Sequence, residues 1–186
     1  MESLPDEALL QRIALQDEAA FGVFYDRHGR LAYSLACRIL GDTAEAEDVV
    51  QEAFLRVWRM AGSFDTQRGN ARTWLLSVVH HRSIDMVRRR RGQPLPAPVS
   101  ETEQPSTAAS HVWNEVSVAL DREAIKAALG QIPSEQKQAI ELAYFGGFTH
   151  QQIAQLAQLP LGTVKGRIRM GMEKLRGLLK DPEMGA

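Results

Sequence analysis

The sequence has little cysteine, few aromatic residues and no long apolar run. Its single cysteine, Cys37, excludes an internal disulfide bond and a zinc site built from cysteines, and it fits a reducing cytoplasm. No apolar stretch approaches the roughly 20 residues that a membrane-spanning helix needs. The first residues, MESLPDEALLQ, contain neither the basic nor the apolar part of an export signal. We therefore expect a soluble, cytoplasmic protein.

Signatures of enzymes and metal sites are also missing from the sequence. It contains no H-E-x-x-H, P-loop or nucleophile-elbow motif. Among the histidines, His80 and His81 are adjacent, but on a helix their side chains point about 100° apart, which makes a poor metal-binding pair. His28 falls within an apolar helical stripe, where a hydrogen-bonded core histidine is more common than a ligand. We expect no catalytic residue, metal, cofactor or small-molecule substrate.

The charged residues, in contrast, are segregated along the chain. The net charge is only −1, yet acidic residues outnumber basic ones in residues 1–60 and 93–145. Basic residues are in excess in residues 61–92 and 146–186. Alternating blocks of this kind suit a protein that meets nucleic acid at two separate places and a different partner elsewhere.

Apolar residues recur at helical spacing over most of the chain, which predicts an all-α fold. The stretch GQPLPAPVSETEQPSTAAS has no such periodicity and is rich in Pro, Ser, Thr and Glu, which predicts a linker without a core. We divide the chain into a helical domain at residues 1–92, a flexible Pro-rich linker at 93–111 and a second helical domain at 112–186. The expected helices cover residues 6–16, 19–40, 44–60, 71–91, 112–129 and 133–144.

Residues 148–179 indicate two further helices joined by a tight corner. Thr149 and Gln152 form a capping box for the first helix, and Pro160 suits the first position of the second. We expect the first helix to bury Ile153, Ala154, Leu156 and Ala157. On the second helix, Val164, Ile168, Met172, Leu175 and Leu179 form a core stripe, and Lys165, Gly166, Arg167 and Arg169 lie on or beside the opposite face.

A basic outer face on the second of two such helices is typical of a helix-turn-helix, whose second helix enters the major groove of DNA. Gly166 costs roughly 1 kcal/mol relative to alanine inside a helix. Its position at the centre of the outer face therefore suggests close approach to DNA. An ordinary helical hairpin with a solvated basic face is the alternative.

The helix at residues 44–60 has an outer face on which Asp48, Gln51 and Glu52 surround Leu55. An exposed leucine ringed by polar and acidic groups resembles a surface that docks on a partner protein. The alternative is a solvated face with one stray leucine.

Residues 61–92 contain seven arginines against two aspartates. A loop at 62–70 leads into a helix that Asn70 can cap, and with Phe64 and Trp74 the segment combines the positive charge and aromatic rings that hold melted strands. The four arginines at the end of this helix could instead only interact with its dipole. The large excess of positive charge favours nucleic acid.

Three stretches, in order along the chain, resemble the sigma-70 family of promoter-specificity subunits of bacterial RNA polymerase. They are AEDVVQEAFLRVW, ARTWLLSVVHHRSIDMVRRRR and, after the Pro-rich linker, IPSEQKQAIELAYFGGFTHQQIAQLAQLPLGTVKGRIR. More narrowly, they look like the small extracytoplasmic-function group, which keeps only domains two and four. The resemblance implies that residues 1–92 form sigma domain two and residues 112–186 form sigma domain four.

The resemblance also implies a role for each surface. The helix at 44–60 matches the surface that docks on the clamp helices of the largest polymerase subunit, through Asp48, Gln51, Glu52 and Leu55. The loop and the helix after it match the element that captures a flipped base of the minus-ten element, through Phe64, Arg68, Asn70, Arg72, Trp74, His81, Asp85, Arg88 and Arg89. The last helix matches the reader of the minus-thirty-five element, through Thr163, Lys165, Gly166, Arg167 and Arg169. The linker would thread toward the active-site cleft of the polymerase.

The sequence departs from the family pattern at a few positions. His81 stands where many relatives have asparagine, which affects the base preference at the minus-ten element. Met170 and Met172 stand where relatives often have arginine, so phosphate contacts there are expected to be fewer.

The implied function is to bind core RNA polymerase, to recognise and help melt promoter DNA, and to direct transcription of a stress or envelope-response regulon. A stand-alone helix-turn-helix regulator is the alternative, but it would not explain the acidic docking helix or the first basic block. No segment resembles a sensor, and the stretch IELAYFGG suggests a subfamily controlled from the membrane. We therefore expect an anti-sigma factor, possibly membrane-anchored, as a further partner.

Overall fold

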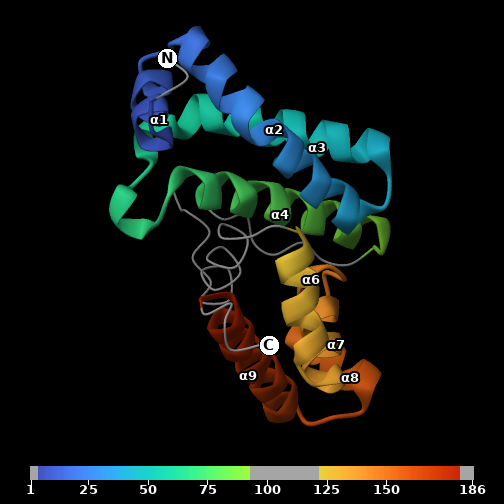
Figure 1. Ribbon diagram of the computed structural model, residues 1–186. Coiled ribbons are helices and arrows are strands. Elements are labelled where there is room, and N and C mark those ends of the chain that lie inside the picture. The colour runs from blue at the N-terminus through green and yellow to red at the C-terminus, as the bar shows by residue number, and fades with distance from the viewer. Residues whose placement is uncertain (1–3, 93–121, 181–186) are drawn as a thin grey trace. The chain divides into compact units, whose positions relative to one another are not determined.

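The computed structural model describes residues 4–92 and 122–180, which form helices and turns without a strand (Figure 1). The predicted all-α fold is confirmed for these residues. The chain divides into two compact units, Met1–Ser106 and Thr107–Ala186. The predicted linker at 93–111 and the first part of the helix predicted at 112–129 lie outside the described residues. None of the helices in the described ranges combines the length and the apolar character that crossing a bilayer requires.

The first unit is built from α1 (Asp6–Ala14), α2 (Glu18–Leu40), α3 (Thr43–Met60) and α4 (Ala71–Arg90), with the short 3₁₀ turns η1 (Ala61–Ser63) and η2 (Thr66–Arg68) between α3 and α4. Asp17, Asp42 and Asn70 each accept a hydrogen bond from the backbone N–H three residues later, which fixes where α2, α3 and α4 begin. α3 buries the apolar residues that recur along it at helical spacing, Ala46, Val49, Val50, Ala53, Phe54 and Val57. α2 packs against both α3 and α4, and α1 contacts α2 and η1.

The second unit is built from α6 (Arg122–Gln131), α7 (Ser134–Tyr144), α8 (His150–Ala157) and α9 (Leu161–Lys180). The predicted capping box is confirmed: the Thr149 hydroxyl accepts from the Gln152 N–H, and the Gln152 side chain accepts from the Thr149 N–H. α9 packs mainly against α7. Its predicted core stripe is buried at Val164, Ile168, Met172 and Leu175, and partly buried at Leu179.

The prediction for the inner face of α8 is partly wrong. Ile153 is buried and Ala154 partly buried, but Leu156 is 62% exposed and Ala157 is also exposed. α8 has only eight residues and ends where Gln158 adopts a left-handed conformation, and its last turn contributes no buried residue. Pro160 also precedes α9 instead of opening it, and its carbonyl oxygen accepts from the N–H groups of Thr163 and Val164.

Candidate nucleic-acid and partner interfaces

The outer face of α3 displays the arrangement expected of a docking surface. Asp48, Gln51 and Glu52 are exposed, and Leu55 exposes 50% of its surface. These residues are three or four positions apart on a helix, so they lie along one strip above the buried face. Trp58, one turn after Leu55, is partly exposed and packs edge-on against Phe21, with ring centroids 5.3 Å apart. An apolar centre with acidic neighbours is therefore available on α3, and the roles of these residues stay a prediction.

Glu52 also faces α4, which sequence reasoning did not detect. Its carboxylate lies 3.8 Å from Nε of Arg82, and the two side chains are 56% and 38% exposed. An exposed pair of this kind contributes only about 0–1 kcal/mol. Glu52 can therefore leave Arg82 for a partner at little cost.

The loop before α4 carries the ring of Phe64, which lies against a buried ring of α4. Phe64 is partly buried and packs on Trp74, with ring centroids 5.5 Å apart. Trp74 is only 6% exposed, so it forms the wall behind Phe64. The Asn70 side-chain oxygen is engaged in capping α4, at 2.8 Å from the N–H of Thr73. Arg68 ends η2, and Arg72 lies partly exposed in the first turn of α4.

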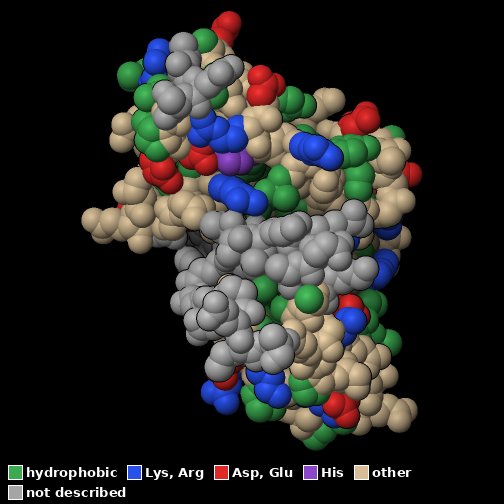
Figure 2. Space-filling view, in the orientation of Figure 1, with side chains coloured by type: hydrophobic (Ala, Val, Ile, Leu, Met, Phe, Trp, Pro, Cys, Tyr) green, Lys and Arg blue, Asp and Glu red, His purple; other side chains and the backbone are tan. Residues whose placement is uncertain are grey.

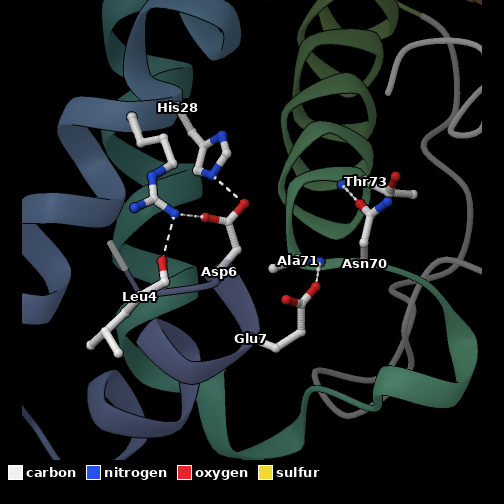
Figure 3. Close-up of polar contacts among 8 residues, drawn as sticks. Leu4, Asp6, Glu7, His28, Asn70, Ala71 and Thr73 are labelled. Carbon is white, nitrogen blue, oxygen red and sulfur yellow. Dashed lines mark hydrogen bonds and ion pairs between the residues drawn. The ribbon is translucent and has the colours of Figure 1, made fainter. Parts of the chain in front are cut away.

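The acids of α1 brace this region, as Figure 3 shows. Asp6 contacts Nε2 of His28 at 2.8 Å and also accepts from Arg27. Glu7 reaches the start of α4, where Oε1 lies 3.4 Å from the N–H of Ala71. Since α1 also packs on η1, it contacts the segment between α3 and α4 at its beginning, η1, and at its end, the first residue of α4. Charged side chains of both signs gather around α1 and α2 on this face (Figure 2).

His28 belongs to the core, as expected, because it is 5% exposed and bonded to Asp6. Burial lowers its pKa from the ordinary value, although the Asp6 carboxylate acts in the opposite direction.

Sequence reasoning missed the bracing roles of Asp6 and Glu7. Their partners are 22 and 64 residues away in the chain, so no local pattern indicates them.

The arginines at the end of α4 are not equivalent. Arg90 donates to the carboxylate of Glu45 at 2.9 Å and to the carbonyl oxygen of Leu40 at 3.1 Å, which ties the end of α4 to the corner between α2 and α3. Arg89 is exposed and Arg88 partly exposed. Arg90 therefore serves the fold, whereas Arg89 has surface to offer to a nucleic acid.

His81 and Asp85 lie one turn apart on α4, and both are partly exposed. Nδ1 of His81 lies 2.6 Å from the carbonyl oxygen of Ser77, so the ring is attached to its own helix. The structure thus places both residues on one side of α4.

The outer face of α9 carries the basic residues that the sequence predicts there. Thr163, Lys165 and Arg169 are exposed, and Gly166 and Arg167 are partly exposed. A Cβ atom at Gly166 would meet nothing within 4 Å, so packing within the described protein does not require glycine there. His150 opens α8, and burial, followed by the nearby Lys165 ammonium, lowers its pKa.

Comparisons with known proteins cover both units. Residues 24–93 match the family Sigma-70 region 2, and residues 122–175 match the family Sigma-70, region 4. The chain is similar to the ECF RNA polymerase sigma factor SigK of Mycobacterium tuberculosis (strain ATCC 25618 / H37Rv), with 37% identity over 93% of this chain and 92% of that protein. It is also similar to SigK of Mycobacterium sp. (strain KMS), with 33% identity over 93% of this chain and 90% of that protein.

A solved structure with similar sequence is that of Rhodobacter sphaeroides SigE in complex with the anti-sigma ChrR. It is 28% identical, covers 95% of this chain and 98% of that chain, and gives a TM-score of 0.49.

Proposed function

This chain belongs to the extracytoplasmic-function group of the sigma-70 family of RNA polymerase sigma factors, and we propose that it performs the group's task through three surfaces. It binds core RNA polymerase, recognises promoter DNA and directs the initiation of transcription. The observation that carries this function is the match to both sigma regions, residues 24–93 and 122–175, together with 37% identity to SigK across 93% of the chain.

The first surface is the outer face of α3, which docks on the polymerase. Leu55 supplies an exposed apolar contact, and Asp48, Gln51 and Glu52 form a polar rim around it. The carboxylates favour a basic partner surface and steer its approach. The neighbouring Trp58 gives this surface an aromatic edge.

The second surface is the loop before α4 together with the exposed side of α4, which receives the melted minus-ten strand. Phe64, backed by Trp74, offers a ring on which a base can stack, and the arginines offer charge to the phosphates. The minus-ten contacts are Phe64, Arg68, Asn70, Arg72, Trp74, His81, Asp85, Arg88 and Arg89. Asn70 and Trp74 act mainly by supporting this surface, since one caps α4 and the other is buried.

The third surface is the outer face of α9, which enters the major groove at the minus-thirty-five element. Arg169 reads a base edge, because its planar guanidinium can bond two acceptors of guanine. Lys165 neutralises a phosphate, and Gly166 permits the backbone to approach the DNA. Thr163 and Arg167 complete this interface.

A stand-alone helix-turn-helix regulator is not favoured. Such a protein needs only the second unit, whereas this chain also matches region 2 over residues 24–93. We further propose that the protein acts in the cytoplasm and performs no catalysis of its own.

Its control comes from an anti-sigma factor that covers the docking face of α3 or the outer face of α9. Both faces expose the groups that such a partner would bury, Leu55 on one and Lys165 and Arg169 on the other.

Run-off transcription with core polymerase on a library of genomic fragments tests the proposed function. The protein should create new, sequence-specific start sites that core polymerase alone does not use. A regulator that does not bind core polymerase would create none.

Affinity purification of the tagged protein from uninduced cells tests the proposed inhibitor. Recovery with core polymerase alone, together with full activity in the absence of an inducing condition, would contradict control by an anti-sigma factor.

A further inference from the structure

The side chain of His81 is attached to its own helix through one ring nitrogen. Nδ1 lies 2.6 Å from the carbonyl oxygen of Ser77, one turn earlier in α4. A carbonyl oxygen can only accept, so Nδ1 carries the hydrogen of this bond. A neutral imidazole has one N–H, and its other nitrogen, Nε2, is then an acceptor. The bond to Ser77 therefore decides which chemical group His81 offers to a ligand.

The carbonyl that holds His81 belongs to a well-packed part of α4. Ser77 is 4% exposed, and its hydroxyl shares a hydrogen bond between the carbonyl oxygens of Thr73 and Trp74, at 3.0 Å each. The ring of His80 packs edge-on against that of His81, with centroids 5.6 Å apart and planes at 87°. These contacts restrict the His81 ring, so Nε2 keeps a defined direction away from Ser77.

Nε2 is available to a ligand. His81 is partly exposed, and within the described ranges its polar contact is the one that Nδ1 makes. Asp85, four residues later on the same side of α4, is also partly exposed and adds a carboxylate, which can only accept when it is ionised. This side of α4 therefore presents two acceptors to an incoming base.

We infer that His81 selects, at one position of the melted minus-ten strand, a base whose amino group is attached to C6 of a purine or C4 of a pyrimidine, adenine or cytosine, and discriminates against thymine. The inference rests on the proposed function. Adenine N6 and cytosine N4 donate hydrogen bonds, whereas thymine has the acceptor O4 at the same place, and O4 would face the lone pair of Nε2. The one donor of thymine on this edge, N3–H, lies between the acceptors O4 and O2, so an approach to it brings the lone pair of Nε2 close to two carbonyl oxygens. An unpaired base exposes these groups on its Watson–Crick edge.

An asparagine at position 81 would not impose the same choice. Its amide carries a donor and an acceptor and can turn either toward a base. A neutral histidine whose Nδ1–H is bonded to Ser77 can offer only the acceptor Nε2, so His81 should accept fewer bases at this position of the minus-ten strand than an asparagine would. Guanine has the acceptor O6 where adenine has its amino group, but it carries the donors N1–H and N2–H beside O6, so it is expected to rank between adenine or cytosine and thymine.

Run-off transcription with core polymerase and the full-length protein tests this selection. The promoters carry each of the four bases at each minus-ten position of the non-template strand. Replacing adenine or cytosine by thymine at one position should reduce initiation by about two- to tenfold, the effect of one hydrogen bond. Replacing adenine by purine, or cytosine by 2-pyrimidinone, removes the amino group alone and should cause a similar loss.

The variant His81→Phe keeps a ring but has no ring nitrogen. With this variant the amino group should not affect initiation, so promoters with purine or adenine, or with 2-pyrimidinone or cytosine, should be transcribed equally well. The variant His81→Gln places an amide near the position of Nε2 and should tolerate thymine better than the wild type does. Nitrogen-15 NMR of the free full-length protein measures the tautomer independently, and we expect a protonated Nδ1 and an unprotonated Nε2 in the neutral ring.

The outcomes separate the inference from the function on which it rests. Absence of specific initiation by the wild type would overturn the proposed function and the inference with it. Accurate initiation with no penalty for thymine, or an analogue effect that persists in His81→Phe, would overturn the inference alone. A neutral ring protonated at Nε2 would likewise overturn it.

Discussion

Gly166 affects helix stability and DNA binding in opposite directions. A Cβ at this position has open space around it, so Gly166→Ala should raise the free energy of unfolding of the second unit by up to about 1 kcal/mol. The same methyl group lies on the face proposed to approach DNA and should weaken binding to minus-thirty-five duplexes. Urea unfolding and duplex titrations measure the two effects.

Gly177→Ala is the matched control for Gly166→Ala. Gly177 lies in the same helix and a Cβ there would also meet nothing within 4 Å, but it is three turns nearer the end of α9. It should gain comparable stability without losing affinity for DNA. Equal DNA binding by Gly166→Ala and the wild type would show that the backbone does not approach DNA at this point.

Lys165 and Arg169 should differ in what their loss does to promoter recognition. Arg169→Ala removes the proposed bidentate base contact, so it should cost about 1–3 kcal/mol on the preferred sequence and relax the preference at one base pair. Lys165→Ala removes the proposed phosphate contact, so it should weaken binding to all sequences alike and reduce the slope of log affinity against log salt concentration by about one. Titrations of a panel of minus-thirty-five variants at several salt concentrations distinguish these effects. Uniform losses with both variants would disprove the assignment.

His28 should make the first unit less stable in mild acid. Burial is the main cause that lowers its pKa in the folded state, Arg27 and Arg72 act in the same direction, and Asp6 opposes them. The unfolded chain therefore binds a proton at higher pH than the fold does, so this contribution to stability is present above the unfolded pKa of 6.5 and decreases as the pH falls below it.

Urea unfolding of the wild type and of His28→Gln across this pH range isolates the contribution of His28. The difference in unfolding free energy between the two proteins should shrink as the pH falls below 6.5. His150 is unchanged in both proteins, so its own lowered pKa cancels from the comparison. A difference that is constant with pH would contradict this origin of the acid sensitivity.

At the scale of the elements, α9 depends on a close approach to α7. A Cβ at Gly171 would lie 2.7 Å from Cδ1 of Ile140 and 3.1 Å from Cβ of Gln136. Gly171→Ala should therefore destabilise the second unit by about 1–3 kcal/mol through overpacking, in spite of the better helix propensity of alanine. Thermal unfolding measures the loss.

A second substitution identifies the clash as the cause. Ile140→Val removes the Cδ1 atom and should cost about 0.5–1.5 kcal/mol alone. Combined with Gly171→Ala, it should cost less than the sum of the two single losses, because the atoms that collide are no longer both present. If the losses of unfolding free energy from the two substitutions simply add, the clash with Cδ1 of Ile140 is not the cause of the destabilisation by Gly171→Ala.

The elements that the sequence predicts correctly are those fixed by neighbouring residues. Asn70 and the pair of Thr149 and Gln152 act within one turn, so their caps follow from local spacing. The buried face of α3 follows from periodicity, because the whole helix packs on one side. In α8 the same reasoning fails at Leu156, which is 62% exposed, since periodicity predicts which residues share a face but not how much of that face the rest of the unit covers.

Features that depend on distant contacts could not be predicted in this way. The run Arg88–Arg91 looks uniform in sequence, and nothing in it singles out Arg90 as the residue that bridges Glu45 and the carbonyl oxygen of Leu40. Asp6 and Glu7 resemble ordinary acids in the first turn of a helix, and only the packing of α1 on the rest of the unit gives them His28 and Ala71 as neighbours. The orientation of His81 is similarly a property of the folded helix.

At the scale of the whole molecule, the charge pattern agrees with three separate surfaces. Residues 1–60, in which acidic side chains are in excess, include the proposed docking face of α3. Residues 61–92 and 146–186, in which basic side chains are in excess, include the two surfaces proposed to meet DNA. A sigma factor has to hold the polymerase while it reads two promoter elements, so one uniformly basic surface would not serve it. The two compact units divide this task, each with its own core.

Binding of core RNA polymerase by the α3 surface tests the proposed function of the whole molecule most directly. The double variant Asp48→Arg with Leu55→Arg reverses the charge and removes the apolar centre of this surface. The control variant, Asp26→Arg with Leu15→Arg, makes the same substitutions at exposed positions of the same unit outside it. Co-purification with core polymerase is measured for tagged forms of all three proteins, and circular dichroism checks that each is folded. We predict that the wild type and the control retain core polymerase and that the α3 variant, although folded, does not. Retention of core polymerase by the α3 variant at the level of the wild type would contradict docking through α3.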